Sequence, residues 1–129
     1  MSEPTNPLAW VQRAEEDYAI AAASVRRKQP WTYGACFHAQ QCAEKYIKAI
    51  LVAHGQEFPK VHDLLALNTL CVQAGILTGF DPARLDVLSA YAVRIRYPGD
   101  DPTAEEARQA VQIAKSVRKL ARDWLGLNK

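Results

Sequence analysis

The sequence predicts an all-α fold: an up-and-down antiparallel bundle of four main helices with one additional short helix. Apolar residues recur at three- and four-residue spacing through several long segments. Proline and glycine stand where helices would begin and end, and no segment shows the polar–apolar alternation of a strand. The 129 residues contain no internal repeat and suffice for one domain, so residues 1–129 are interpreted as a single helical domain.

The first helix is expected over residues 7–28. Asn6 followed by Pro7 is an N-cap residue before a proline at the first helical position. Apolar side chains then recur on one face of the helix. The basic residues at 26–28 are expected to close it, because positive charge suits the negative end of the helix dipole.

A second helix is expected over residues 31–54, between Pro30 and Gly55. Within it, residues 35–51 (ACFHAQQCAEKYIKAIL) place alanine and isoleucine on one side at 100° per residue. Polar side chains gather in a row on another side: His38, Gln41, Lys45 and Lys48. The small residues allow a neighbouring helix to approach closely, and the polar row requires partners of its own.

A short helix is expected over residues 62–74, ending before Gly75. Asp63 is expected to favour the positive N-terminal end of this helix. His62 is expected to hydrogen-bond to Glu44 or to the backbone, which is a structural role.

Two further helices are expected over residues 82–96 and 102–125. Asp81 and Asp101 each precede a proline, so each is expected to cap the helix that follows. Matched helix lengths and short connections favour antiparallel packing of the bundle.

Composition limits the classes of function. The net charge of +2 does not by itself indicate a nucleic-acid-binding protein. The three cysteines form no CxxC pair and the three histidines lack metal-site spacing, so we expect buried free thiols, no metal and no cofactor. No apolar run reaches the roughly 20 residues that span a bilayer, and no signal peptide is visible, so the expected location is the cytoplasm.

Aromatic and basic side chains near the helix ends are expected to have structural rather than ligand-binding roles. Trp31, Tyr33 and Trp124 are expected to anchor the core or an interface rather than to stack on nucleic acid bases. Basic residues such as Arg118 and Arg122 are expected on solvated helix faces.

Three segments, in this order, resemble the HEPN domain family (higher eukaryotes and prokaryotes nucleotide-binding domain). They are the opening helix with Trp10 and Asp17, the 35–51 helix followed by KVHDL at 60–64, and YAVRIRYPGD at 91–100. The resemblance covers nearly the whole chain. It implies a helical bundle that forms a homodimer and that is often paired with a minimal nucleotidyltransferase in a toxin–antitoxin-like system.

Ribonucleases of the HEPN family carry Arg-x(4–6)-His at the start of the final helix. Their arginine is placed for phosphate, and their histidine acts on the ribose 2′-hydroxyl and the leaving oxygen. In this chain Arg94 and Arg96 match the arginine, but no histidine follows His62. An aspartate at 100 or 101 is a poor replacement, because the phosphodiester repels it and its pKa would have to rise by several units. The resemblance therefore assigns no catalytic residue.

Four residues are candidates for binding a nucleotide or phosphate: Arg94, Arg96, His38 and Lys45. Guanidinium groups beside the positive start of the last helix suit phosphate, and pairing with acidic neighbours is the alternative. His38 either lines a dimer cleft or is satisfied at a helix–helix contact.

The leading hypothesis is a nucleotide- or RNA-binding HEPN homodimer that partners a minimal nucleotidyltransferase and has no ribonuclease motif. Two alternatives stay open. One is a metal-independent ribonuclease whose acid–base residue is supplied by His38, by Asp100 or by a partner chain. The other is a purely structural dimeric adaptor.

Overall fold

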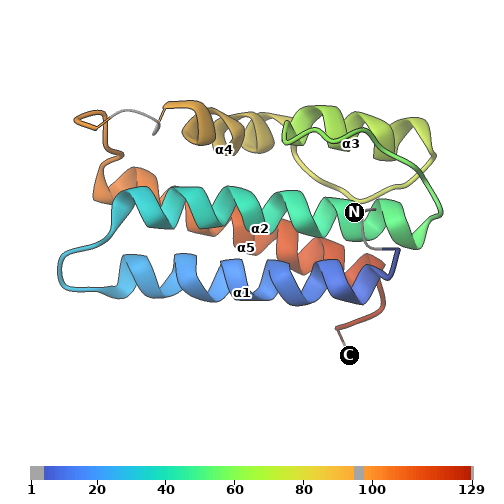
Figure 1. Cartoon of the computed structure of the whole chain (residues 1–129), viewed down its shortest axis with the longest axis horizontal. Coiled ribbons are helices and arrows are strands. Elements are labelled where there is room, and N and C mark those ends of the chain that lie inside the picture. The colour runs from blue at the N-terminus through green and yellow to red at the C-terminus, as the bar shows by residue number, and fades with distance from the viewer. Residues whose placement is uncertain (1–4, 95–97, 129) are drawn as a thin grey trace.

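The computed structural model describes residues 5–94 and 98–128, without the side chains of residues 92–94. Within this part the helices are α1 (Pro7–Arg26), α2 (Thr32–Ala53), α3 (Leu64–Gln73), α4 (Pro82–Arg94) and α5 (Ala104–Trp124). None of the described residues lies in a strand, so the predicted all-α class is confirmed (Figure 1).

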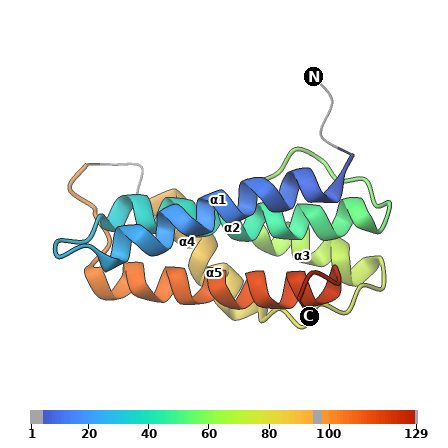
Figure 2. The same ribbon diagram turned by 90° about the horizontal axis from the view of Figure 1, so that it is seen from below.

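Helix α2 is central to the bundle. It contacts each of the other four helices, whereas within the described residues α1 packs only against α2 and α5. The four long helices α1, α2, α4 and α5 alternate in direction along the chain, and the short α3 precedes α4 on the same side of α2 (Figures 1 and 2). The α1–α2 turn and the α4–α5 connection lie at the same end of the bundle, on the left in both figures.

Two helices begin where their capping signals predict, at Pro7 and Pro82, whereas α3 begins at Leu64, two residues later than predicted, with Asp63 as its N-cap. The side chain of Asn6 accepts a hydrogen bond from the Leu8 N–H at 3.0 Å, with Pro7 at the first helical position. Asp81 and Asp63 accept in the same way from backbone N–H groups two residues later, at 3.0 Å and 2.9 Å. Each cap satisfies one of the N–H groups that a helix start leaves unpaired.

The predicted cap of the last helix is wrong. Helix α5 begins at Ala104, and its N-cap is Thr103 rather than Asp101. Thr103 Oγ1 accepts from the Glu106 N–H at 3.0 Å, and Glu106 Oε1 accepts from the Thr103 N–H at 2.9 Å. This reciprocal capping box satisfies two backbone donors, whereas an aspartate cap at 101 would satisfy one.

The other predicted helix ends are one or two residues too long. Helix α1 stops at Arg26 because Arg27 adopts an extended conformation. Helix α2 begins one residue after Trp31, whose backbone N–H donates to the carbonyl of the buried Ser24. The predicted end of the fourth helix at residue 96 lies outside the described residues.

The core is built around the apolar side of α2. Alanines of α1, α2 and α5 are fully buried where these helices meet, so the backbones approach closely. Cys36, Cys42 and Cys71 are buried and free. Burial raises the pKa of Cys71 to about 11 and that of Cys42 higher still, so both thiols stay uncharged at neutral pH. No helix in the described part is long and apolar enough to cross a membrane.

Candidate functional site

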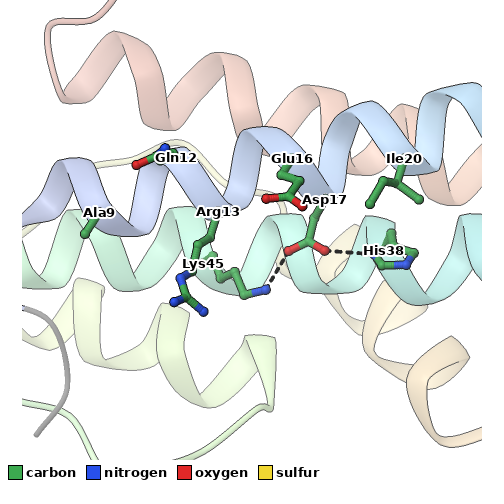
Figure 3. Close-up of a pocket in the computed structure, with 8 residues that line it drawn as sticks. All are labelled: Ala9, Gln12, Arg13, Glu16, Asp17, Ile20, His38 and Lys45. Atoms are coloured by element: carbon green, nitrogen blue, oxygen red, sulfur yellow. Dashed lines mark hydrogen bonds and ion pairs between the residues drawn. The ribbon is translucent and has the colours of Figure 1, made fainter.

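An open groove of about 550 Å³ runs between the outward faces of α1 and α2 (Figure 3). It brings together two of the predicted ligand candidates, His38 and Lys45. The residues that line it are Ala9, Gln12, Arg13, Glu16, Asp17, Ile20, His38 and Lys45.

Helical spacing places these side chains along the groove. On α1, Arg13, Glu16 and Ile20 are three or four residues apart and therefore share one face. On α2, His38 and Lys45 are seven residues apart, which corresponds to two turns. The groove therefore has one wall from each helix.

Asp17 holds the two walls together. Its Oδ1 lies 2.8 Å from His38 Nδ1, and its Oδ2 lies 2.6 Å from Lys45 Nζ. Asp17 is 7% exposed, so its charge requires both partners. The histidine is therefore satisfied at a helix–helix contact, one of the two roles considered from the sequence, and it also lines this groove of the single chain. The other role, lining a dimer cleft, stays a prediction.

The contact with Asp17 also orients the His38 imidazole. When Nδ1 carries the proton and donates it to Asp17, Nε2 keeps its lone pair and can accept from a ligand hydroxyl. When the ring is protonated, Nε2 becomes a donor that suits a phosphate oxygen. Either form leaves one ring nitrogen for a ligand, because Asp17 uses only Nδ1.

Arg13 supplies a second cation at the groove. It is exposed, and no ion pair engages it within residues 5–94 and 98–128. The formal charges of Arg13 and Lys45 balance those of Glu16 and Asp17. The groove therefore suits a localised anionic group with polar atoms beside it, such as one phosphate and its sugar.

The second pair of predicted ligand candidates cannot be joined to this groove. Arg94 ends α4 and its side chain lies outside the described part, as does all of Arg96. Helix α4 packs against α2, α3 and α5 and does not contact α1 in the described part. Both arginines therefore remain predictions from the sequence.

A polar network, with buried members on α2, holds the segment before α3 onto α2. His62 Nδ1 lies 3.0 Å from Glu44 Oε2, the partner considered from the sequence, and Gln40 Nε2 donates to the His62 carbonyl at 3.0 Å. Lys48 Nζ donates to Glu44 Oε2, also at 3.0 Å, and lies over the ring of Trp10. Glu44 and Lys48 are almost fully buried, whereas the His62 side chain is 79% exposed, so the network is buried at α2 and reaches the surface at His62.

The solvated-face interpretation is wrong for two arginines of α5. Arg118 donates from Nε and Nη2 to the two carboxylate oxygens of Glu15, at 2.6 Å and 2.8 Å. Tyr46 donates to the same carboxylate, and Arg122 donates to the Tyr46 hydroxyl at 3.4 Å. The hydrogen bond from Arg118 lowers the pKa of Glu15, and burial raises that of Tyr46. These groups join α1, α2 and α5.

The core interpretation of the aromatic residues is also wrong. Trp31 is 60% exposed, Tyr33 is 50% exposed and Trp124 is 37% exposed. Their role at an interface stays a prediction.

His38 and Lys45 were predicted from the sequence, but Asp17, which pairs with both of them, was not. Asp17 occupies the apolar register of the first helix, with Trp10 and Ala14 before it and Ala21 after it. A charged residue in such a stripe signals a buried partner, which could have identified it. Across the described part of the chain, no three histidine, cysteine or acidic residues lie close enough to hold a metal ion.

Comparison with known proteins gives one family match, to the HEPN domain, over residues 8–124. Among solved structures, TT1696 from Thermus thermophilus is similar at 25% identity with a TM-score of 0.73, covering 92% of this chain and 97% of that one. ST0689, an archaeal HEPN homologue, is similar in fold at 22% identity with a TM-score of 0.68, covering 92% and 96%. No curated protein matches the chain.

Proposed function

The chain belongs to the HEPN domain family, and we propose that it is a member that binds a nucleotide or nucleic acid. In this proposal it is the partner of a minimal nucleotidyltransferase in a toxin–antitoxin-like pair. It acts there as a homodimer in the cytoplasm, and without the Arg-x(4–6)-His ribonuclease motif. The sequence supports the last point, because His62 is its final histidine.

The observation that carries the binding proposal is the groove between α1 and α2. Asp17 fixes Lys45 in place through one N–H and leaves two N–H donors for a ligand. Arg13 adds a guanidinium that can bind phosphate oxygens in a bidentate manner. His38 Nε2 then contacts a sugar hydroxyl or a second phosphate oxygen. A nucleotide offers both kinds of group.

Equilibrium titration with ATP, GTP and a short RNA tests this assignment. Arg13→Ala should weaken binding about tenfold or more, because hydrogen bonds between charged groups are among the stronger ones. Arg108→Ala is the matched control, since Arg108 is an exposed arginine on α5 that does not line the groove. No binding of any of the three ligands at millimolar concentration would remove the proposal.

The same titration with Arg94→Ala and Arg96→Ala tests the other candidate residues. If these variants bind more weakly and Arg13→Ala binds as the wild type does, the binding site lies at the end of α4. Equal binding in all variants and the wild type would favour a structural adaptor.

The contact between Asp17 and His38 favours one second candidate, a metal-independent ribonuclease. In that reaction His38 Nε2 takes the proton of the ribose 2′-hydroxyl and the 2′-oxygen attacks phosphorus. The bond from phosphorus to the 5′-oxygen breaks, and the departing oxygen takes a proton from solvent. Cleavage that is lost in both His38→Gln and Asp17→Asn would support this candidate. Cleavage that survives in both would indicate a contaminating nuclease.

A further inference from the structure

The turn between α1 and α2 carries an exposed basic and aromatic surface, formed by residues 26–28 with Trp31 and Tyr33. We call it the basic–aromatic corner. All five side chains are exposed, and a hollow of about 470 Å³ lies against Arg27, Lys28 and Gln29. Large aromatic side chains are normally mostly buried, so two of them beside three cations require an explanation. We propose that the basic–aromatic corner binds single-stranded nucleic acid.

The first reason is charge. Within the described part of the chain no ion pair engages residues 26–28, so their three positive charges face solvent together. The whole chain has a net charge of +2, which means that the other residues sum to −1. These three residues therefore give the corner a local excess of positive charge, as a phosphate backbone requires.

The second reason is the presentation of aromatic ring faces. The Arg27 guanidinium carbon lies 3.6 Å from the centroid of the Trp31 ring and so covers one face of the indole. Trp31 remains 60% exposed, which leaves surface for a base. Next to it, the rings of Tyr33 and Phe37 are nearly parallel, with centroids 6.3 Å apart and an interplanar angle of 10°. Nucleobases of any sequence stack on such surfaces, and cations hold the adjoining phosphates.

The third reason is continuity with the groove. Phe37, 39% exposed, lies on α2 between the corner and His38, and Ile20, also 39% exposed, is the groove residue of α1 nearest to the corner in sequence. From Arg26 to Arg13 the rise along α1 is about 20 Å, which a chain of several nucleotides spans and a mononucleotide does not. The α4–α5 connection at the same end of the bundle carries the exposed acidic residues Asp100 and Asp101. Their charge directs the strand along α1 and α2 instead. The part of this path that lies in the groove depends on the proposed function, in which the groove is the binding site.

Fluorescence anisotropy with a labelled single-stranded RNA of about 12 nucleotides, within the usual range of stacking sites, tests the inference on the full chain. The wild type should bind it more tightly than ATP, with an affinity that falls as salt rises. Trp31→Ala should weaken binding about fivefold or more at unchanged salt dependence, because it removes a stacking surface but no charge.

The charge contribution is tested by replacing Arg26, Arg27 and Lys28 together with glutamine. Neutralising three phosphate contacts should reduce the slope of log affinity against log salt by about 2. The control replaces three exposed basic residues elsewhere with glutamine, and it should leave the slope unchanged: Arg84, Arg108 and Lys115.

Equal effects of the two triple variants, with Trp31→Ala binding as the wild type does, would overturn the inference. If ATP binding then still required Arg13, the proposed function would stand without the corner. Binding of neither ATP nor RNA would remove both proposals.

Single-stranded DNA, titrated in parallel with the RNA, shows whether the 2′-hydroxyl contributes to binding. Binding of anionic vesicles or an acidic peptide through the corner, with no RNA binding, would overturn the inference in favour of a membrane or protein partner.

Discussion

At the residue scale, the main feature is the buried carboxylate of Asp17 between α1 and α2. It converts an alanine-rich contact between α1 and α2 into a polar site, because both of its oxygens hold side chains of α2. Polar residues His38 and Lys45 were predicted from their row on the helix, whereas their shared partner was not. A row on one helix shows that partners are needed, but only the packing of two helices determines which residue supplies them.

Asp17→Asn should lower the free energy of unfolding by about 2 kcal/mol, since it removes the charge that His38 and Lys45 share. Urea denaturation measures this change. Glu16→Gln is the matched control: the neighbouring carboxylate is exposed, so its loss should change stability by less than about 0.5 kcal/mol. Equal stability of the two variants would contradict a structural role for Asp17.

Glu15 makes the stability depend on pH. The hydrogen bond from Arg118 lowers its pKa in the folded protein below the ordinary value of 4.5. The unfolded chain therefore binds the proton more readily, so the stability that Glu15 contributes is fully present above pH 4.5 and is lost as the pH falls through the lowered pKa.

Unfolding curves of the wild type and Glu15→Gln, measured from neutral to acidic pH, test this dependence. The wild type should be more stable at neutral pH, and the difference should shrink once the pH falls below 4.5. A difference that is constant across the whole range would show that the Glu15 carboxylate does not titrate in the way described.

At the element scale, the helices were largely predictable because each carries its own local signals. Asn6 and Asp81 cap helices as predicted from local rules, whereas Asp63 was placed inside the short helix and is its N-cap. The last helix was assigned the wrong cap because two capping signals lie within three residues. The proline rule favoured Asp101, and the threonine–glutamate capping box at Thr103 and Glu106 determines the structure.

The two candidate caps of α5 can be compared directly. Thr103→Ala should lower the free energy of unfolding by about 1 kcal/mol, whereas Asp101→Ala should change it by a few tenths at most. Thermal or urea denaturation of both variants is the measurement. A larger loss for Asp101→Ala would restore the assignment made from the proline rule.

The exposed aromatic residues show that burial cannot be predicted from residue type and local sequence alone. Trp31 and Tyr33 are large aromatic residues of the kind that usually anchor a core. They lie at the start of α2, beside the turn, and are exposed to solvent. Whether a large apolar side chain is buried depends on which helix covers it. Arg118 and Arg122 were expected in solvent but are partly buried in ion pairs, because Glu15 of α1, which is far from them in sequence, packs beside them.

At the scale of the whole molecule, the bundle exposes several large hydrophobic side chains within its described part: Leu8, Ile20, Trp31, Tyr33, Phe37, Val72, Leu77, Val87 and Trp124. The family resemblance implies a homodimer, in which some of these side chains would be covered, and a twofold pair is the most common symmetric assembly. We therefore expect sedimentation at micromolar concentration to show a homodimer. A monomer under those conditions would contradict this expectation.

The proposed pairing with a minimal nucleotidyltransferase is tested by affinity capture of the tagged full chain from its own host. Mass spectrometry should identify a small nucleotidyltransferase that co-purifies in stoichiometric amount. Recovery of the chain alone would contradict the pairing and would favour a free-standing dimer.

The groove between α1 and α2 is tested most directly by NMR of the three histidine side chains during titration with ATP and with the short RNA. His38 lines the groove, while His54 and His62 do not and serve as internal controls. A ligand in the groove should shift the His38 ring resonances in a saturable manner, leave the other two unchanged, and lose this effect in Arg13→Ala. A bound ligand that shifts His54 or His62 but not His38 would show that the site lies elsewhere on the molecule.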